Sequence, residues 1–226
     1  MSRGGEKLDA ALDTFEIDVG AKRALDAGAS TGGFTDCLLQ RGAAEVIAVD
    51  VGHGQLHERL RADPRVIVRE RTNIRAVEPA SIGGVVGVVV ADLSFISLRA
   101  AADNLLRACC AAGDLVVLVK PQFEATHAEA SRVRGVITDP AVWRRTLLEV
   151  GTALGSRGAA IMGVMVSPLR GAEGNVEFLM HAIAGAGELT PKDLSTMVDA
   201  AVRGAGPTGT DAVGSDAQAA PERRER

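Results

Sequence analysis

Strand-sized apolar runs alternate with helical stretches along most of this 226-residue chain, and this alternation limits the folds that it can adopt. Such alternation is typical of an α/β fold with a doubly wound, mostly parallel sheet that helices cover on both faces. The expected strands are Arg23–Asp26, Glu45–Asp50, Arg65–Arg69, Val85–Ala91, Leu115–Lys120, Ala160–Val166 and Asn175–Met180. The expected helices are Lys7–Phe15, Thr31–Arg41, Gly54–Arg61, Leu98–Ala112, Pro140–Ser156 and Pro191–Arg203.

The length and a change of composition at Pro207 indicate one domain followed by a tail. The chain is about one and a half times the usual length of a domain. Residues 207–226 contain no Leu, Ile, Phe, Met or Trp, so they have few side chains whose burial could offset the entropy of ordering. We therefore expect a folded domain over residues 1–206 and a disordered tail over residues 207–226.

The charge and the apolar pattern bear on where the protein acts and on its partners. A net charge of −4 lacks the basic surplus that nucleic-acid-binding domains usually show. The best apolar run, Val85–Ala91, is too short to span a membrane. The first residues lack a hydrophobic signal segment. The sequence thus predicts a cytoplasmic protein without a membrane partner.

The cysteines and histidines show no pattern that favours a metal site. Cys37, Cys109 and Cys110 lack metal-ligand spacing, and each lies in a stretch expected to be helical. The four histidines are scattered, and the close pair His53 and His57 has no nearby Cys or carboxylate to complete a zinc set. We therefore expect no metal and read the cysteines as reduced thiols.

The segment Leu25–Thr35, with the sequence LDAGASTGGFT, carries the strongest functional signal. An apolar strand ends at Asp26, a turn of small residues follows, and a helix begins. At the carboxyl edge of a doubly wound sheet, this first turn is where nucleotide-like ligands bind. Gly28 and Gly32 would let the backbone approach such a ligand. The next expected strand ends at Asp50, where a carboxylate can accept both hydroxyls of a ribose.

Two classes of cofactor fit a glycine turn in this position. A dinucleotide site favours G-x-G-x-x-G, with a pyrophosphate on the helix N-terminus. Here the order is Asp-x-Gly-x-x-x-Gly-Gly, and Asp26 would repel a phosphate. The acid suits a ligand with a cationic amino-acid end, so we expect S-adenosylmethionine as the cofactor.

Several motifs in order resemble a known family. They are SRGGEKL at 2–8, DAGASTGGFTD at 26–36, VDVGHGQL at 49–56, ERTNIR at 70–75, VADLSFISL at 90–98, LVKPQFE at 118–124 and GNVEFL at 174–179. Together they resemble the TlyA (hemolysin A) family of FtsJ-like methyltransferases, which modify ribose 2′-hydroxyls of ribosomal RNA. The resemblance runs from Ser2 to about Pro207. It implies a Rossmann-like, S-adenosylmethionine-dependent methyltransferase with an antiparallel seventh strand.

The resemblance also implies site residues. The family's catalytic Lys-Asp-Lys-Glu set falls on Lys7, Asp92, Lys120 and Glu177. Burying the charge of a lysine at the end of an apolar strand is costly unless the charge is paired. Such a lysine therefore has a partner or a function, which agrees with a role for Lys120. An alcohol acceptor must lose a proton, and Lys120 is the candidate base or polarising group. The expected cofactor-binding residues are Asp26, Gly28, Ser30, Gly32, Gly33, Phe34, Asp50, Val51, Asn73 and Asp92.

The chain departs from the family in ways that leave the acceptor open. The family usually has a small N-terminal RNA-binding domain before the SRGG segment. This sequence begins at that segment, so we expect the domain to be missing and a helper protein to be a possible source of RNA recognition. A His stands at position 53, where an aromatic residue is common, and Ala125–Gly135 replaces a Gly-rich loop. RNA 2′-O-methylation is the leading interpretation. The alternatives are methylation of a nucleoside-like or peptide-like small molecule, and a binding protein or hemolysin without catalysis.

Overall fold

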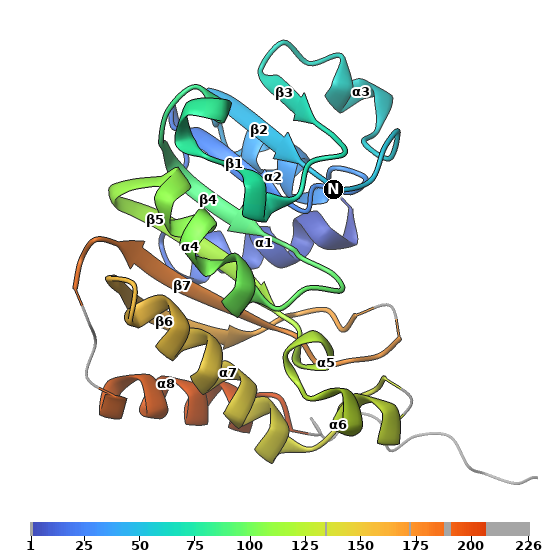
Figure 1. Ribbon diagram of the computed structural model, residues 1–226, viewed down its shortest axis with the longest axis vertical. Coiled ribbons are helices and arrows are strands. Elements are labelled where there is room, and N and C mark those ends of the chain that lie inside the picture. Colours follow the sequence, from blue (N-terminus) through green and yellow to red (C-terminus); the bar gives the residue numbers. More distant parts are fainter. Residues whose placement is uncertain (1, 134, 172, 188–190, 207–226) are drawn as a thin grey trace, which may run out of the picture.

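The computed structural model describes residues 2–133, 135–171, 173–187 and 191–206 (Figure 1). The expected tail over residues 207–226 lies outside the described residues, so the division at Pro207 stays a prediction. None of the described helices combines the length and the apolar character needed to cross a bilayer.

A single seven-stranded sheet forms the centre of the molecule, in the order β3-β2-β1-β4-β5-β7-β6. Neighbouring strands from β3 to β5 run parallel, and β7 runs antiparallel to both β5 and β6. This order confirms the doubly wound, Rossmann-like methyltransferase fold with one antiparallel strand near the C-terminus. The strands are β1 (Arg23–Ala27), β2 (Glu45–Val49), β3 (Val66–Arg69), β4 (Val86–Ala91), β5 (Cys109–Val119), β6 (Ala159–Val166) and β7 (Phe178–Ala184).

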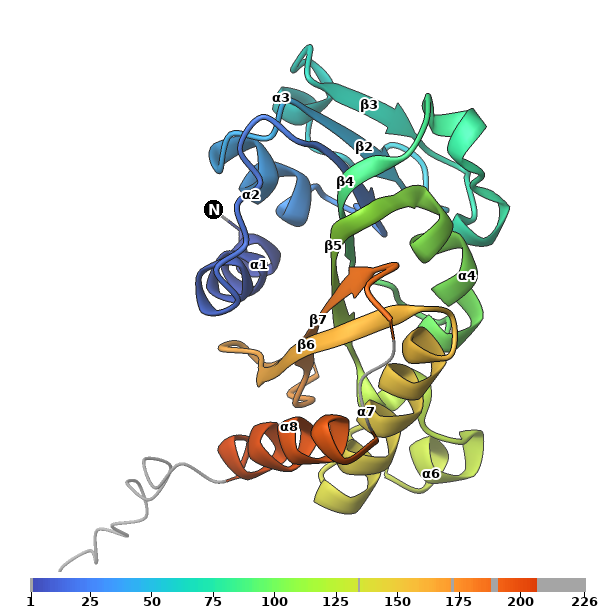
Figure 2. The ribbon, with the colours of Figure 1, turned by 90° about the vertical axis from the view of Figure 1, so that its left-hand side faces the viewer.

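Helices lie on both sides of the sheet (Figure 2). Helices α1 (Arg3–Thr14) and α2 (Gly33–Gln40) cover one face. Helices α4 (Leu98–Ala108), α7 (Pro140–Gly155) and α8 (Pro191–Gly204) lie on the other side. The shorter helices are α3 (Glu58–Arg61), η1 (Ile74–Ala76), η2 (Pro79–Ile82), α5 (Pro121–Glu124) and α6 (His127–Arg132).

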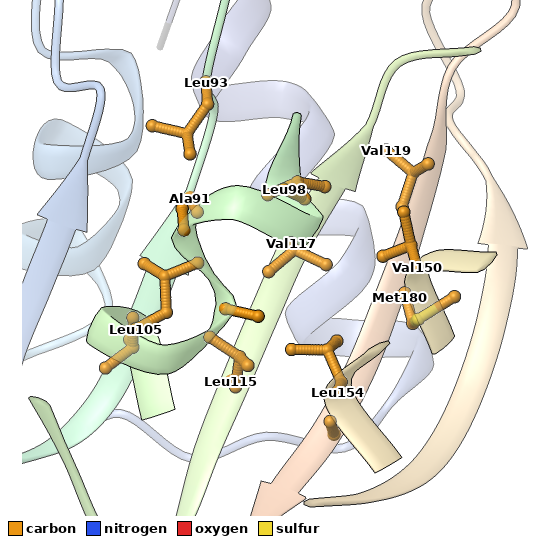
Figure 3. Packing of buried hydrophobic residues seen from close by; sticks show 14 of the residues in the cluster. Ala91, Leu93, Leu98, Leu105, Leu115, Val117, Val119, Val150, Leu154 and Met180 are labelled. Atoms are coloured by element: carbon orange, nitrogen blue, oxygen red, sulfur yellow. The ribbon is translucent and has the colours of Figure 1, made fainter. Parts of the chain in front are cut away.

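Strand β5 shows how the two helical layers share one aliphatic core. Leu115, Val117 and Val119 point towards α4 and α7, where they pack with residues such as Leu105 and Leu154 (Figure 3). The alternate residues of the strand, Val116 and Leu118, pack on the side of α1 and α2. A strand buried on both faces has a continuous apolar sequence, which is why the sequence predicted this part of β5 correctly.

The structure corrects the expected bounds at both ends of the chain. Helix α1 begins at Arg3, four residues before the expected start, because Ser2 caps it by accepting a hydrogen bond from the Gly5 amide at 3.2 Å. Strand β7 begins at Phe178, not Asn175. The Asn175 side chain instead accepts from the Ile137 amide and donates to the Gly135 carbonyl, both at 2.9 Å, so this segment connects loops.

Two other segments also differ from expectation. Residues 54–57 are not helical, and helix α3 is confined to Glu58–Arg61, where His57 is the N-cap. Helix α4 ends at Ala108, and Cys109 and Cys110 begin β5 instead of continuing the helix. The strand is irregular there, because its register with β4 shifts between Val86 and Val88.

Candidate active site

The carboxyl ends of β1, β2 and β4 bring three predicted residues to one edge of the sheet. Ala27 of β1 is paired with Val49 of β2 and with Ala91 of β4. The next residues along the three strands, Gly28, Asp50 and Asp92, therefore lie side by side where the strands end. In an open α/β sheet, this edge is where ligands bind.

A cavity of about 690 Å³ opens at this edge. The predicted cofactor-binding residues that line it are Gly28, Ser30, Asp50, Val51, Asn73 and Asp92. Thr72, Arg75, Ser94 and Phe95 also line it and were not predicted. A signal for two of them was present, since Ser94 and Phe95 stand in the VADLSFISL motif directly after Asp92.

Asp50 lines this cavity and is held by the backbone of two loops. Its Oδ2 accepts a hydrogen bond from the Ser30 amide at 2.7 Å, and its Oδ1 accepts one from the Gly52 amide at 2.6 Å. These two bonds fix the carboxylate between the turn after β1 and the turn after β2. A carboxylate has further lone pairs, so Asp50 can still accept hydrogen bonds from a ligand.

The glycines of the first turn are explained mainly by contacts within the chain. A Cβ on Gly28, which has φ +88°, would lie 2.4 Å from the Asp92 carbonyl oxygen. A Cβ on Gly32 would lie 2.2 Å from Leu60, and one on Gly33 would lie 2.6 Å from Ser2 Oγ. Gly28 lines the cavity, whereas Gly32 and Gly33 line a separate groove beside α3. These two glycines therefore allow close packing and are not part of the main cavity.

Two further predicted residues, Asp26 and Phe34, are buried and do not line the cavity. Phe34 is buried in the core on the α1 and α2 side. Asp26 is also fully buried, and its Oδ2 accepts a hydrogen bond from Thr35 Oγ1 at 2.6 Å. Burial raises the pKa of Asp26 to about 7, although the Thr35 hydrogen bond lowers it and the charge of Asp92 adds to the rise.

Lys120 stands directly after β5 and contacts two residues that line the cavity. Its Nζ is 2.5 Å from Asp92 Oδ1 and donates a hydrogen bond to Ser94 Oγ at 3.1 Å. The lysine side chain is 12% exposed and that of Asp92 is 25% exposed. Lys120 Nζ also lies 5.8 Å from the centre of the Phe123 ring. The ammonium group is thus held at the edge of the cavity.

Lys7 and Glu177 form a second, more deeply buried ion pair. Lys7 Nζ donates to Glu177 Oε2 at 2.5 Å, and the side chains are 10% and 3% exposed. A Cβ on Gly171 would lie only 2.6 Å from Glu177 Oε1, so the chain closes tightly over this carboxylate. The pair joins the first helix to the segment before β7, across most of the sequence.

The register of the sheet brings the two ion pairs towards one another. Val119 of β5 is paired with Phe178 of the antiparallel strand β7. Lys120 follows Val119 and Glu177 precedes Phe178, so their backbones stand at the same end of this strand pair. The structure therefore gathers all four residues of the predicted Lys-Asp-Lys-Glu set at one edge of the sheet, as two ion pairs.

An exposed aromatic residue stands at the rim of the cavity. Phe95 is 91% exposed and has φ +64°, a left-handed conformation that bulky side chains rarely adopt. Its ring centre lies 5.2 Å from that of Phe123, in a tilted arrangement. Unfavourable backbone geometry and exposure of a large apolar ring at one residue suggest a binding role.

Comparison with known proteins identifies the class of enzyme to which this fold, cavity and pair of ion pairs belong. The FtsJ-like methyltransferase family model matches residues 1–183. The chain belongs to this family and is an S-adenosylmethionine-dependent methyltransferase.

Individual relatives are similar to this chain over most of its length. The chain is 51% identical over 180 residues to the 16S/23S rRNA (cytidine-2′-O)-methyltransferase TlyA of Mycobacterium tuberculosis; the match covers 80% of this chain and 67% of the relative. It is 40% identical to hemolysin A of Brachyspira hyodysenteriae, covering 81% and 76% of the two chains. A crystal structure of a protein from Lactococcus lactis described as a hemolysin superposes with a TM-score of 0.82 at 38% identity, covering 88% and 97%. The TlyA resemblance seen in the sequence is thereby confirmed.

Proposed function

We propose that this enzyme transfers a methyl group from S-adenosylmethionine to a ribose 2′-hydroxyl of ribosomal RNA. The observation that carries the proposal is the position of Lys120, whose ammonium group contacts Asp92 and Ser94 at the wall of the cavity. The names of relatives such as the Mycobacterium tuberculosis methyltransferase support RNA as the acceptor. Methyl transfer, the enzyme class and the cofactor do not depend on the identity of the acceptor.

The residues of the cavity are suited to S-adenosylmethionine. Asp50 would accept hydrogen bonds from the ribose hydroxyls, and the backbone at Gly28 and Ser30 would lie against the ligand. Val51 is 69% exposed, so its side chain offers apolar contact for an adenine ring. Asn73 and Asp92 complete the polar lining. The cofactor supplies an activated methyl group, and the cavity has only to hold it in line with the acceptor.

Lys120 would act on the acceptor hydroxyl. A ribose hydroxyl has a high pKa and must lose its proton during attack, or immediately after it. In its neutral amine form Lys120 can accept that proton, and in its ammonium form it can polarise the oxygen. Asp92 fixes the amine, and the buried pair Lys7–Glu177 fixes the end of β7 beside it. We assign these four residues to the catalytic set.

Phe95 supports a nucleoside as the acceptor. A base flipped out of an RNA strand needs an apolar surface on which to stack, and aromatic side chains supply it. The exposed ring at the cavity rim, which packs against Phe123 of the turn that carries Lys120, would offer this surface to a base whose ribose reaches Lys120.

Methyl incorporation into defined acceptors tests the proposal. The enzyme is incubated with labelled S-adenosylmethionine and either ribosomal subunits that lack 2′-O-methylation, or a metabolite extract. We expect label in ribosomal RNA, recovered after nuclease digestion as a 2′-O-methylated nucleoside. Label on a base, or only in the metabolite fraction, would contradict the RNA proposal and favour the small-molecule alternative. Activity on subunits only after a cell extract is added would support the predicted helper protein.

A further inference from the structure

Glu124 is a buried carboxylate at the end of the short helix α5, four residues after Lys120. It is only 2% exposed, and it does not line the cofactor cavity. Helix α5 continues the turn that carries Lys120 and Phe123. A buried carboxylate is costly unless its oxygens are satisfied, so the partners of Glu124 show what the fold uses it for.

Its partners all belong to the beginning of α4. Glu124 Oε2 accepts a hydrogen bond from Ser97 Oγ at 2.5 Å, and Oε1 accepts one from the Leu98 amide at 2.6 Å. Arg99 donates to Glu124 Oε2 at 3.3 Å and to the Glu124 carbonyl oxygen at 3.1 Å. A carboxylate at the first turn of an α-helix satisfies free amides and complements the helix dipole. Glu124 thus fastens the α5 turn to the start of α4.

The same two segments also meet at the catalytic end. The segment Asp92–Ser97, which leads from β4 to α4, has no regular secondary structure. It contacts the Lys120 turn through Asp92 and Ser94, and through the ring pair of Phe95 and Phe123. The two segments are therefore joined by reactive groups at one end and by Glu124 at the other. Because the loop is irregular, its fixed ends determine where Asp92 and Ser94 stand relative to Lys120.

We propose that Glu124 is a positioning residue that sets Lys120 against Asp92 and Ser94 by locking the α5 turn to the N-terminus of α4. This inference rests on the proposed action of Lys120 on the acceptor. A displacement of about 1 Å between reacting groups can lower a rate by on the order of a hundredfold. The role of Glu124 is therefore expected to appear in turnover more than in cofactor binding.

Replacement Glu124→Gln tests the proposal, because the shape is retained while one oxygen becomes an NH2 group. Three donors surround the carboxylate, so the amide must face at least one of them and break that contact. We expect kcat to fall by about tenfold or more, with KM for S-adenosylmethionine within about twofold of the wild-type value. The melting temperature is measured in parallel.

Glu149→Gln is the matched control. Glu149 Oε2 lies 2.8 Å from Arg99 Nη1, but Glu149 is on α7, where it also forms an ion pair with Arg145 of the same helix. Glu149→Gln removes the negative charge of one of the two carboxylates that contact Arg99. We expect it to leave kcat within about twofold of the wild-type value. If Glu149→Gln lowers kcat as much as Glu124→Gln does, the effect comes from Arg99 and the proposal is overturned.

Lys120→Ala is assayed beside these variants. It separates the positioning role of Glu124 from the proposed action of Lys120 on the acceptor, on which that role rests. An inactive Lys120→Ala enzyme together with a folded Glu124→Gln enzyme of wild-type kcat would overturn the positioning role alone. An active Lys120→Ala enzyme would overturn both.

If Glu124→Gln does not fold, Glu124→Asp is used, which keeps the charge but shortens the side chain. A folded Glu124→Asp enzyme with reduced kcat and unchanged KM supports the proposal, and one with wild-type kcat overturns it.

Discussion

The two lysine–carboxylate pairs have the same contact distance of 2.5 Å but different surroundings. Lys7–Glu177 is closed off, with Glu177 only 3% exposed and the chain at Gly171 pressed against it. Lys120–Asp92 faces the cavity, and Asp92 is 25% exposed. The proposed catalytic set is thus divided into a sealed pair that would fix the framework and an open pair that a substrate could reach.

The physical chemistry of burial explains why the two pairs should respond differently to mutation. Removing one member of a buried pair leaves an uncompensated charge, which costs about 3–5 kcal/mol of folding free energy. Lys120 is nearly as buried as Lys7, at 12% against 10% exposed, but its partner Asp92 is 25% exposed and lines the cavity. Asp92 can therefore be hydrated when Lys120 is lost, so less stability depends on this pair. The comparison therefore predicts loss of rate at Lys120 and loss of stability at Lys7 or Glu177.

The largest effect is expected at Lys120. Lys120→Ala should lower kcat by about 10²–10⁴-fold, because the group that takes or polarises the hydroxyl proton is lost. Lys120→Arg should fail as well, since a guanidinium does not give up its proton in this pH range. Initial rates with labelled S-adenosylmethionine, and the cofactor Kd by calorimetry, measure the two functions separately. The Kd should change little.

A lysine in an ion pair outside the site provides the control for this prediction. Lys22 Nζ lies 3.1 Å from Asp114 Oδ2, before the start of β1 and thus at the opposite end of that strand from Gly28. Lys22→Ala should retain the wild-type rate. A Lys120→Arg enzyme that works near the wild-type rate would rule out the base role of Lys120.

The sealed pair should show its effect in the free energy of unfolding. Lys7→Met or Glu177→Gln is expected to cost about 3–5 kcal/mol, measured by urea denaturation at neutral pH. The double variant should lose less than the sum of the two single variants, because no charge is left buried. Asp13→Asn, which removes a partner of Arg41 on the surface, should leave the denaturation midpoint nearly unchanged. Equal losses at the surface pair and the sealed pair would contradict the comparison.

The sequence predicts those features of the site that depend on residues close together in the chain. Strand ends and the order of polar residues along the chain are local, so the positions of Gly28, Asp50 and Asp92 could be predicted. The Lys7–Glu177 contact joins distant segments, and only the family resemblance placed the two residues in one set. Direct cofactor contact was expected at Gly32, but this glycine lies against Leu60. A packing glycine and a ligand-binding glycine look alike in sequence, because both are selected for the lack of a Cβ.

Asp26 is a buried carboxylate that, unlike Glu177 and Asp92, has no lysine partner among the described residues. Its Oδ1 has no hydrogen-bond partner among the described residues, and its pKa is raised to about 7 by burial and the nearby charge of Asp92. The folded protein therefore binds a proton more readily than the unfolded chain. Between about pH 4 and pH 7 the folded state holds more protons, so this residue makes stability fall as the pH rises through that window.

Asp26→Asn should remove this pH-dependent cost. Relative to the wild type, the variant is expected to gain on the order of 2–4 kcal/mol between pH 5 and pH 8.5, as the wild-type carboxyl ionises. Melting temperatures of both proteins at several pH values measure the difference. A difference that stays constant over this range would mean that Asp26 titrates alike in the folded and unfolded states.

The smallest expected effect concerns Asp50, a carboxylate that the structure pairs with amides instead of a lysine. Asp50→Ala would remove the expected hydrogen bonds to the cofactor ribose, and such charge-assisted bonds contribute about 1.5–3 kcal/mol each. The Kd for S-adenosylmethionine should therefore rise by about tenfold or more, as measured by calorimetry on the folded variant. Asp63→Ala is the control, because Asp63 contacts Arg65 and lies outside the main cavity. The two variants then separate binding from chemistry. Asp50→Ala should raise KM for the cofactor at nearly constant kcat, and Lys120→Ala should lower kcat at nearly constant KM for the cofactor. An unchanged Kd in folded Asp50→Ala would place the ribose elsewhere in the cavity.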